Sequence, residues 1–312
     1  MKICAPISSA RFLLRGCMIA LKVDIDTYEG MKKGLPALLD FFRAKGIKAS
    51  FYVSFGPDES GKAVKRVFTK KGFLKKMFRT NAAKLYGFKT MLYGTLLPAP
   101  NVGTNFPELV KRIAADGHEA GVHAWSHVRW QDELDRLTSE EIDAELGNAV
   151  KAHREILKSS PAGFAAPAWK INEKGLAALL KCGFKYLSVG RGPEPAVPFI
   201  GRTRSAIPEI PTTLPTLDEI LAWDGITPEF ALSSLISLPG KGRLNVYTLH
   251  TEAEGAVYLP FFEKLIEGWQ KRGFSFVRMD ETAVQLNVLR LPEREYKQGA
   301  LAGRAGDVAI IM

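Results

Sequence analysis

The most regular pattern along the chain is the alternation of apolar and polar positions in residues 19–27, Ile-Ala-Leu-Lys-Val-Asp-Ile-Asp-Thr. Apolar residues at every second position predict a buried β-strand. The stretch ends in two carboxylates, Asp24 and Asp26, with one residue between them. Side chains at i and i+2 of a strand point to the same face, so both should face one spot at the carboxyl end of the strand. Two neighbouring acids repel each other, and a nearby cation relieves that repulsion.

Strand-like and helix-like segments alternate along the rest of the chain. Helical spacing of apolar residues predicts helices over residues 35–46, 106–115, 138–157, 172–181, 228–236 and 258–272. Short apolar runs predict strands over residues 48–55, 118–124, 163–166, 186–189, 245–250 and 274–277. We expect residues 191–218, which are rich in proline, to be irregular. The alternation has no linker, which indicates a single α/β domain with a parallel, barrel-like sheet.

Composition sets outer bounds on this interpretation. Apolar residues make up 46% of the 312 residues, as expected for a globular protein with a sizeable core. The three cysteines show no zinc-binding spacing, which suits a reducing compartment. No apolar run is long enough to span a membrane, and arginines interrupt the only apolar stretch near the N-terminus. We therefore expect a cytoplasmic protein with an extension over residues 1–17, one domain over 18–290 and a surface tail over 291–312.

The positive charge is concentrated in one window. Residues 61–90 contain as many Lys and Arg as the net charge of the whole chain, +10, and no acid. Apolar residues lie between them at helical spacing, so we expect a basic amphipathic insertion over about residues 57–105. A solvated helix face and a nucleic-acid site are alternatives, but nothing else in the chain supports nucleic-acid binding. We favour a surface that lies on an anionic membrane, formed by Lys65, Arg66, Phe73, Lys75, Lys76 and Phe78.

The histidines are the candidate metal ligands. His123 and His127 are four residues apart just after a predicted strand, a spacing that brings two imidazoles to one side of a helical turn. Two structural histidines are the alternative interpretation of this pair. His118 follows a turn and is better explained as structural, and His153, in a charged helix, as solvated. His250 ends a predicted strand, as Asp24 and Asp26 do.

Taken together, these motifs resemble a known family. Asp-x-Asp at 24–26, Gly-His-Glu-x-Gly-x-His-x-x-x-His at 117–127 and Leu-His at 249–250 are similar to the polysaccharide deacetylase (NodB-homology) superfamily. The likeness is greatest to its 4-deoxy-4-formamido-L-arabinose-phosphoundecaprenol deformylase branch. It is carried by Val-Asp-Ile-Asp-Thr at 23–27, Gly-Val-His-Ala-Trp at 121–125, Ile-Pro-Thr-Thr-Leu-Pro-Thr at 210–216, Tyr-Thr-Leu-His-Thr-Glu-Ala-Glu-Gly at 247–255 and Gly-Ala-Leu-Ala-Gly-Arg at 299–304. The resemblance implies a single-domain, distorted (β/α)7-type barrel.

The resemblance also implies an amide hydrolase that uses a divalent ion. Asp26, His123 and His127 would bind Zn, Mn or Co, ions that all accept this ligand set. Asp24 would serve as general base, and His250 would protonate the leaving amine. The substrate would be a lipid-linked amino-sugar phosphate, reached from the inner face of the cell membrane.

Two departures from the branch bear on the substrate. This chain has Ala168-Trp169-Lys170 where the branch has Gly-Trp-Arg, and Val189 where the branch has an acid two residues before Arg191. We expect Trp169, Lys170, Arg191 and Glu252 to contact the substrate or support the catalytic residues. A de-N-acetylase acting on another acyl amino sugar and a non-catalytic, membrane-associated binding homologue remain alternative functions.

Overall fold

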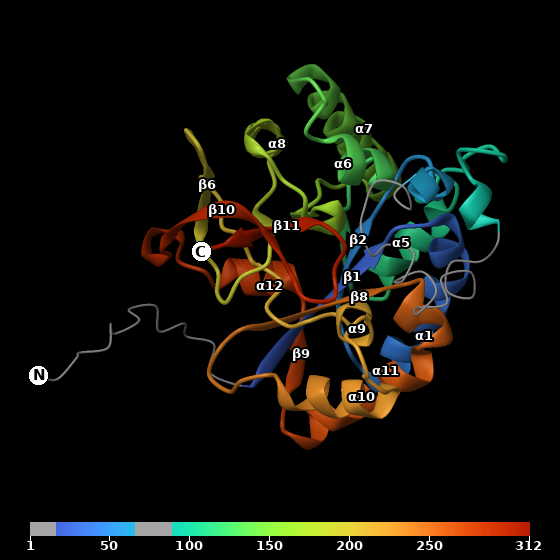
Figure 1. Ribbon diagram of the computed structural model, residues 1–312, viewed down its shortest axis with the longest axis vertical. Coiled ribbons are helices and arrows are strands. Elements are labelled where there is room, and N and C mark those ends of the chain that lie inside the picture. Colours follow the sequence, from blue (N-terminus) through green and yellow to red (C-terminus); the bar gives the residue numbers. More distant parts are fainter. Residues whose placement is uncertain (1–16, 66–88) are drawn as a thin grey trace, which may run out of the picture.

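A central sheet of seven parallel strands organises the structure. The computed structural model describes residues 17–65 and 89–312 of the chain (Figure 1). The strands are β1 (Met18–Ile25), β2 (Ser50–Val53), β3 (Glu119–Val122), β4 (Gly163–Ala165), β5 (Tyr186–Ser188), β8 (Asn245–His250) and β9 (Ser275–Val277). Their order is β5-β4-β3-β2-β1-β8, and β9 pairs with the start of β1. The predicted α/β fold with a parallel sheet is confirmed.

Parallel pairing gathers the carboxyl ends of the strands at one end of the sheet. β1 lies between β2 and β8, with Asp24 opposite Tyr52 of β2 on one side and opposite His250 of β8 on the other. β3 continues the sheet beyond β2, with Val122 opposite Val53. The residues that follow β1, β3 and β8 therefore meet at one end of the barrel.

An irregular segment, residues 208–214, lies between β5 and β8. Ile210 N–H donates to Leu187 O (2.8 Å) on the β5 side, and Leu214 N–H donates to Val246 O (3.1 Å) on the β8 side. Pro208 and Pro211 have no N–H to donate, so this segment cannot form a regular strand. The barrel is therefore distorted here, at a place where the sequence predicted irregular structure.

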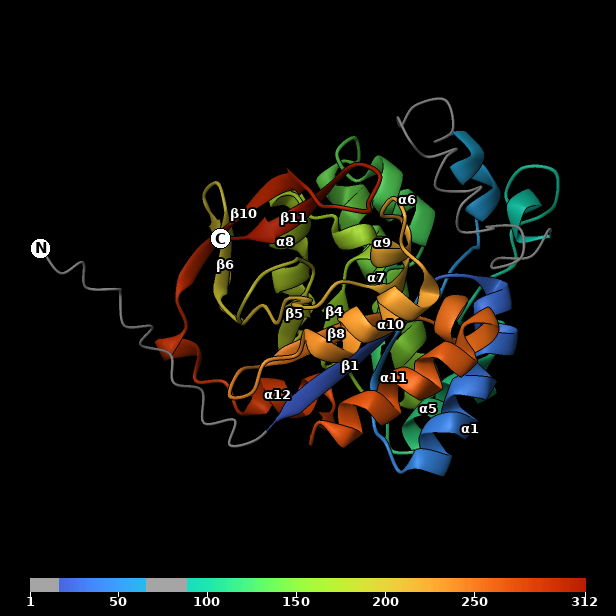
Figure 2. The ribbon, with the colours of Figure 1, turned by 60° about the horizontal axis from the view of Figure 1, so that its bottom comes forward.

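Helices pack around the outside of the sheet. Figure 2 shows α1, α5 and α11 side by side along one flank of β1 and α7 and α8 farther round the barrel. The helices of the described chain are α1 (Leu35–Lys45), α5 (Pro107–Ala115), α6 (His127–Glu133), α7 (Ser139–Leu157), α8 (Glu173–Lys181), α9 (Leu217–Leu221), α10 (Pro228–Ser237), α11 (Leu259–Lys271) and α12 (Met279–Val284). None of the helices in residues 17–65 and 89–312 is both long and apolar enough to cross a bilayer.

The alternation in β1 divides the core into two parts. Ile19, Leu21, Val23 and Ile25 belong to the large cluster packed between the sheet and the helices. The even-numbered Ala20 joins a second cluster that includes Tyr52, Tyr186 and Val246. The strand is thus buried on both faces, as parallel strands are, and its even-numbered side chains point into the barrel.

The predicted surface tail is wrong. Residues 291–312 contain β10 (Glu293–Ala300) and β11 (Asp307–Ile311), which join β6 (Val197–Ile200) and β7 (Thr203–Arg204) in a second sheet beside α8 (Figures 1 and 2). Tyr296, Val308 and Ile311 are buried. β6, β7 and α9 also give regular structure to parts of residues 191–218, which we expected to be irregular throughout.

Candidate active site

Asp24 and Asp26 lie at the carboxyl end of β1. Asp24 is the last inward-facing residue of the strand and is buried, whereas Asp26 follows the strand and is half-buried. A buried glutamate holds the chain at this point, because Glu252 Oε1 accepts hydrogen bonds from Asp26 N (3.2 Å), Thr27 N (2.8 Å) and Thr27 Oγ1 (2.7 Å). Gly30 is needed beside it, since a Cβ at this position would lie 2.0 Å from Glu252 Oε1.

The two histidines flank a sharp turn after β3. Ala124 adopts φ 75°, which turns the chain between His123 and the start of α6. Ser126 caps α6 by accepting a hydrogen bond from Arg129 N (3.3 Å), and His127 is the first residue of that helix. This local geometry brings both imidazoles to one side, with 5.4 Å between ring centroids.

Asp26, His123 and His127 converge on one point. His123 Nε2 lies 3.2 Å from Asp26 Oδ1, and His127 Nε2 lies 3.3 Å from Asp26 Oδ2. One ligand atom from each residue lies within 4.8 Å of the other two. His123 Nδ1 is 2.9 Å from Ala165 O, so its N–H donates there and the Nε2 lone pair is free for a ligand.

The donor set fits a divalent metal ion. Burial alone would raise the pKa of Asp26, but the neighbouring His127 and His123 outweigh it and hold that pKa well below its usual value. Asp26 Oδ1 is buried and has no hydrogen-bond partner among the described residues. One ionised carboxylate and two imidazoles with open positions beside them are a familiar arrangement for divalent transition metals.

His250 ends β8 directly beside Asp24. The two residues are register partners on neighbouring strands, and Thr251 N donates to Asp24 O (3.1 Å). Glu254 accepts a hydrogen bond from His250 N (3.0 Å) and fixes the turn after the strand. Burial lowers the pKa of the imidazole, but Asp26, Asp218 and Asp24 together raise it above its usual value. The structure thus brings Asp24, Asp26, His123, His127 and His250 to one end of the barrel.

The remaining predicted site residues lie in two places. Trp169 is buried, with its indole N–H donating to Thr212 Oγ1 (3.1 Å), and Lys170 follows it half-buried. Arg191 is also buried: its guanidinium pairs with Glu219 (2.7 Å) and lies 4.9 Å from the Trp169 ring centroid. Glu252 lies under Asp26, as described above.

A carboxylate from elsewhere in the chain binds the backbone at Val189, where the deformylase branch has an acid. The buried carboxylate of Glu209 accepts hydrogen bonds from Val189 N (3.0 Å) and Gly190 N (2.8 Å), and Tyr296 O–H donates to it (2.7 Å). Burial raises the pKa of Glu209 to about 7. This chain therefore has an apolar side chain at Val189, but the carboxylate of Glu209 is hydrogen-bonded to the backbone N–H of the same residue.

The other two histidines lie outside this cluster. His118 is buried and its Nδ1 accepts a hydrogen bond from Ala49 N (3.1 Å), which agrees with a structural role. The prediction that His153 is solvated is wrong: it is buried, with its ring nitrogens 2.9 Å from Ala120 O and 3.1 Å from Ser159 O. His153 lies on the buried face of α7 together with Ala149 and Val150, between the exposed Lys151 and Arg154.

Three residues that the sequence did not indicate lie near the predicted site residues: Lys22 pairs with Asp24, Asp218 acts electrostatically on His250, and Arg304 lies over the Trp169 ring. The alternation in residues 19–27 places Lys22 on the same face of the strand as Asp24, and this is the signal that could have indicated its inward direction. Arg304 belonged to a segment expected to be a tail, so nothing placed it near Trp169.

Of the residues expected to face a membrane, Arg66, Phe73, Lys75, Lys76, Phe78 and the side chain of Lys65 lie outside the described part of the structure.

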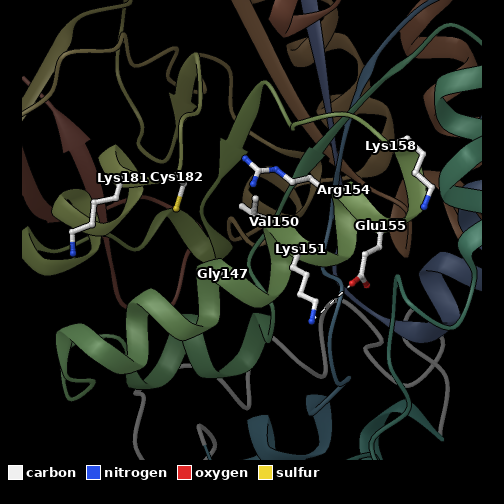
Figure 3. A pocket seen from close by; sticks show the side chains of 8 residues that line it. All are labelled: Gly147, Val150, Lys151, Arg154, Glu155, Lys158, Lys181 and Cys182. Atoms are coloured by element: carbon white, nitrogen blue, oxygen red, sulfur yellow. Dashed lines mark ion pairs between the residues drawn. The ribbon is translucent and has the colours of Figure 1, made fainter.

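A surface hollow between α7 and α8 is separate from these residues. Figure 3 shows its lining, in which Lys151 and Glu155 form an ion pair (3.9 Å) and Cys182 lies across from Arg154. The lining comes from the C-terminal parts of the two helices, which lie toward the end of the barrel where the strands begin. This hollow is therefore at the opposite end from Asp24 and His250.

Comparison with known proteins identifies the class. Residues 16–187 match the family model for polysaccharide deacetylase. A solved structure of a protein from Mycobacterium smegmatis, assigned to the polysaccharide deacetylases, superposes with a TM-score of 0.63 at 18% identity, covering 96% of this chain and 99% of that one. The chain belongs to the polysaccharide deacetylase family, and it is a hydrolase of amide C–N bonds.

Two relatives narrow the comparison. The chain is 36% identical to a protein named as probable 4-deoxy-4-formamido-L-arabinose-phosphoundecaprenol deformylase ArnD of Shewanella sediminis, over 84% of this chain and 85% of that protein. It is 32% identical to a protein of the same name from Wigglesworthia glossinidia brevipalpis, over 90% of this chain and 97% of that protein.

Proposed function

We propose that this chain is a metal-dependent N-deformylase that acts on a lipid-linked 4-formamido sugar phosphate of the arabinose type, within lipid A modification. The observation that carries the proposal is the pairing of Asp24 with His250 beside the Asp26, His123 and His127 cluster. The similarity to the two deformylases over most of both chains supports the acyl group and the carrier.

Asp26, His123 and His127 would hold the metal ion. A divalent ion bound there would polarise the formyl oxygen and make a water molecule more acidic. Zn, Mn and Co all suit one carboxylate and two imidazoles. The hydrogen bond from His123 Nδ1 to Ala165 O fixes the ring that presents Nε2, and Glu252 fixes the backbone that carries Asp26.

Asp24 and His250 would handle the protons. Hydrolysis adds a water oxygen to the formyl carbon and breaks the C–N bond, releasing formate and the free amine. Asp24 would accept the proton of the attacking water, because its Oδ1 has no hydrogen-bond partner among the described residues. An amine cannot leave as its anion, so a donor is required, and His250, on the neighbouring strand, would protonate the nitrogen.

A de-N-acetylase is the second candidate. Lys170 and Val189 differ from the deformylase pattern. Lys170 directly follows Trp169, and Val189 precedes Arg191 by two residues. A different acyl group or carrier would account for these differences. A non-catalytic membrane-associated homologue is a weaker alternative, because both proton-handling residues are present.

We also propose that the protein acts at an anionic membrane surface, on its cytoplasmic side. The basic window of residues 61–90 begins and ends beside the site: Glu59 accepts a hydrogen bond from Ser126 (3.0 Å), and Gly61 N donates to Tyr93 O (2.9 Å). Nearby, Leu96 is 81% exposed. On this proposal, a lipid-linked substrate would approach the barrel on the side where Glu59 and Ser126 lie.

The decisive experiment measures amine release from formyl- and acetyl-amino-sugar glycolipids by protein of known metal content. We expect release from the formyl substrate, and a loss of about 10²–10⁴-fold in Asp24→Asn with the metal retained. Preference for the acetyl substrate would favour the second candidate, and undiminished turnover in Asp24→Asn would refute the base assignment. For the membrane proposal, the protein should co-sediment with anionic vesicles at low salt, and equal binding to neutral vesicles would contradict it.

A further inference from the structure

The interior of the barrel contains a lysine that this reaction does not yet use. Lys22 precedes Asp24 by two residues on β1, so both side chains point into the barrel. The Lys22 side chain is 0% exposed. Removing an ammonium group from water is energetically costly, and fully buried lysines are rare without a partner. Its partners therefore indicate what it does.

The contacts of Lys22 hold its ammonium against Asp24. Nζ donates to Ser188 O on β5 (3.2 Å) and lies 3.6 Å from Asp24 Oδ2. The ring centroids of Trp169 and Tyr52 are 5.3 Å and 5.8 Å from Nζ, close enough for cation–π attraction. A carbonyl and two rings thus fix the cation, and the carboxylate of Asp24 is its ionic partner.

The other acid near Lys22 is occupied by different donors. Glu209 contributes an electrostatic attraction to Lys22, but its oxygens accept hydrogen bonds from the backbone of Val189 and Gly190 and from Tyr296. Asp24 Oδ1, by contrast, is buried without a hydrogen-bond partner in the described chain. One oxygen of Asp24 is therefore held by a cation while the other is left to accept a proton.

We propose that Lys22 is a positioning residue for Asp24. Its ammonium balances the carboxylate charge in the buried interior of the barrel and fixes the orientation in which Oδ1 meets the attacking water. The proposal rests on the proposed function, because it takes Asp24 to be the general base. Misplacement of a catalytic group by about 1 Å can cost on the order of 10²-fold in rate, so the loss of this contact should be visible in turnover.

The first test removes the charge and keeps the length of the side chain. We expect Lys22→Met to lower kcat by about 10–100-fold, to leave KM within about twofold and to keep the metal content unchanged. Lys22→Arg, which retains a cation, should recover part of the lost kcat. Glu119→Gln is the matched control, since Glu119 is also a buried charged residue but lies at the other end of the barrel; its kcat should not change.

The second test is a double-mutant cycle with Asp24→Asn. If Lys22 acts through Asp24, Lys22→Met should cause no further loss in the Asp24→Asn background. Additive losses, or normal kcat in Lys22→Met, would overturn the proposal while leaving the proposed function intact. Equal turnover in wild type and Asp24→Asn would refute the base assignment on which this proposal rests, whereas failure of the wild type to release amine from the formyl substrate would refute the proposed function itself. Lys22→Gln replaces Lys22→Met in the cycle if the latter does not fold, and failure of both to fold would show a structural role and overturn the proposal.

Discussion

The guanidinium of Arg304 lies over the indole of Trp169, with 4.4 Å between Cζ and the ring centroid. Trp169 follows β4 of the barrel, whereas Arg304 lies in the turn between β10 and β11. Arg304 also pairs with Glu219 (3.4 Å), the same buried carboxylate that pairs with Arg191. Gly303 permits this approach, because a Cβ there would lie 2.1 Å from Glu219 O. The second sheet is therefore joined to the barrel beside the candidate active site.

Replacing Arg304 tests how much its contacts with Trp169 and Glu219 contribute to the stability of the fold. Arg304→Met removes a cation–π contact and a largely buried ion pair, so we expect a loss of about 1–3 kcal/mol in the free energy of unfolding. Chemical denaturation measures it. Arg290→Met, at an exposed position, is the control and should change stability by less than about 0.5 kcal/mol. Equal stability of the two variants would show that the contact contributes nothing.

Ala168 stands at a backbone position that favours glycine. It adopts φ 52°, in the left-handed region that favours glycine, and the deformylase branch has glycine at this position. We expect Ala168→Gly to raise the free energy of unfolding by roughly 0.5–1 kcal/mol, because it removes backbone strain next to Trp169. The control is Ala166→Gly, where φ is −86° and glycine should destabilise. The expectation fails if both substitutions change the thermal midpoint in the same direction.

The barrel and the cluster of acids and histidines were predictable from local signals. The alternation in β1 and the spacing of His123 and His127 each lie within a few residues, and parallel strands bring such segments together at one end. The second sheet was not predictable, because β10 is a polar strand with only Tyr296 fully buried, and its partners β6 and β11 are set by tertiary packing. The helix that contains His153 has a solvated face and a buried face. The charged neighbours Lys151 and Arg154 indicated the solvated face, but His153 lies on the buried one.

Metal binding can be tested separately from catalysis. Protein freed of metal by a chelator should gain thermal stability when Zn, Mn or Co is added, by about 2.7 kcal/mol at a concentration of 100 times Kd. His123→Ala should lose this gain, because it removes one of three ligands. His118→Gln is the control, since His118 lies outside the cluster and its ring accepts a hydrogen bond from Ala49 N. A gain that persists in His123→Ala would place the metal elsewhere.

The pH dependence of stability depends on a buried carboxyl at the other end of the barrel. Glu119 contacts Ser50 Oγ, accepts a hydrogen bond from Tyr186 O–H (2.7 Å) and lies near Asp280, whose N–H donates to it (3.1 Å). Burial, reinforced by the charge of Asp280, raises the pKa of Glu119 from 4.5 to about 7. The folded chain therefore binds this proton more tightly than the unfolded chain does.

The sign of the effect follows from that difference. The stabilisation from Glu119 is complete below about pH 4.5 and is lost as the pH rises to about 7. Relative to Glu119→Gln, the free energy of unfolding of the wild type should fall by up to about 3 kcal/mol between pH 5 and pH 8. Denaturation of both proteins at several pH values measures this slope, whatever their offset at any one pH. Glu263→Gln, at an exposed position of α11, should show no such slope against the wild type. A constant difference between wild type and Glu119→Gln over this range would mean that Glu119 does not titrate there.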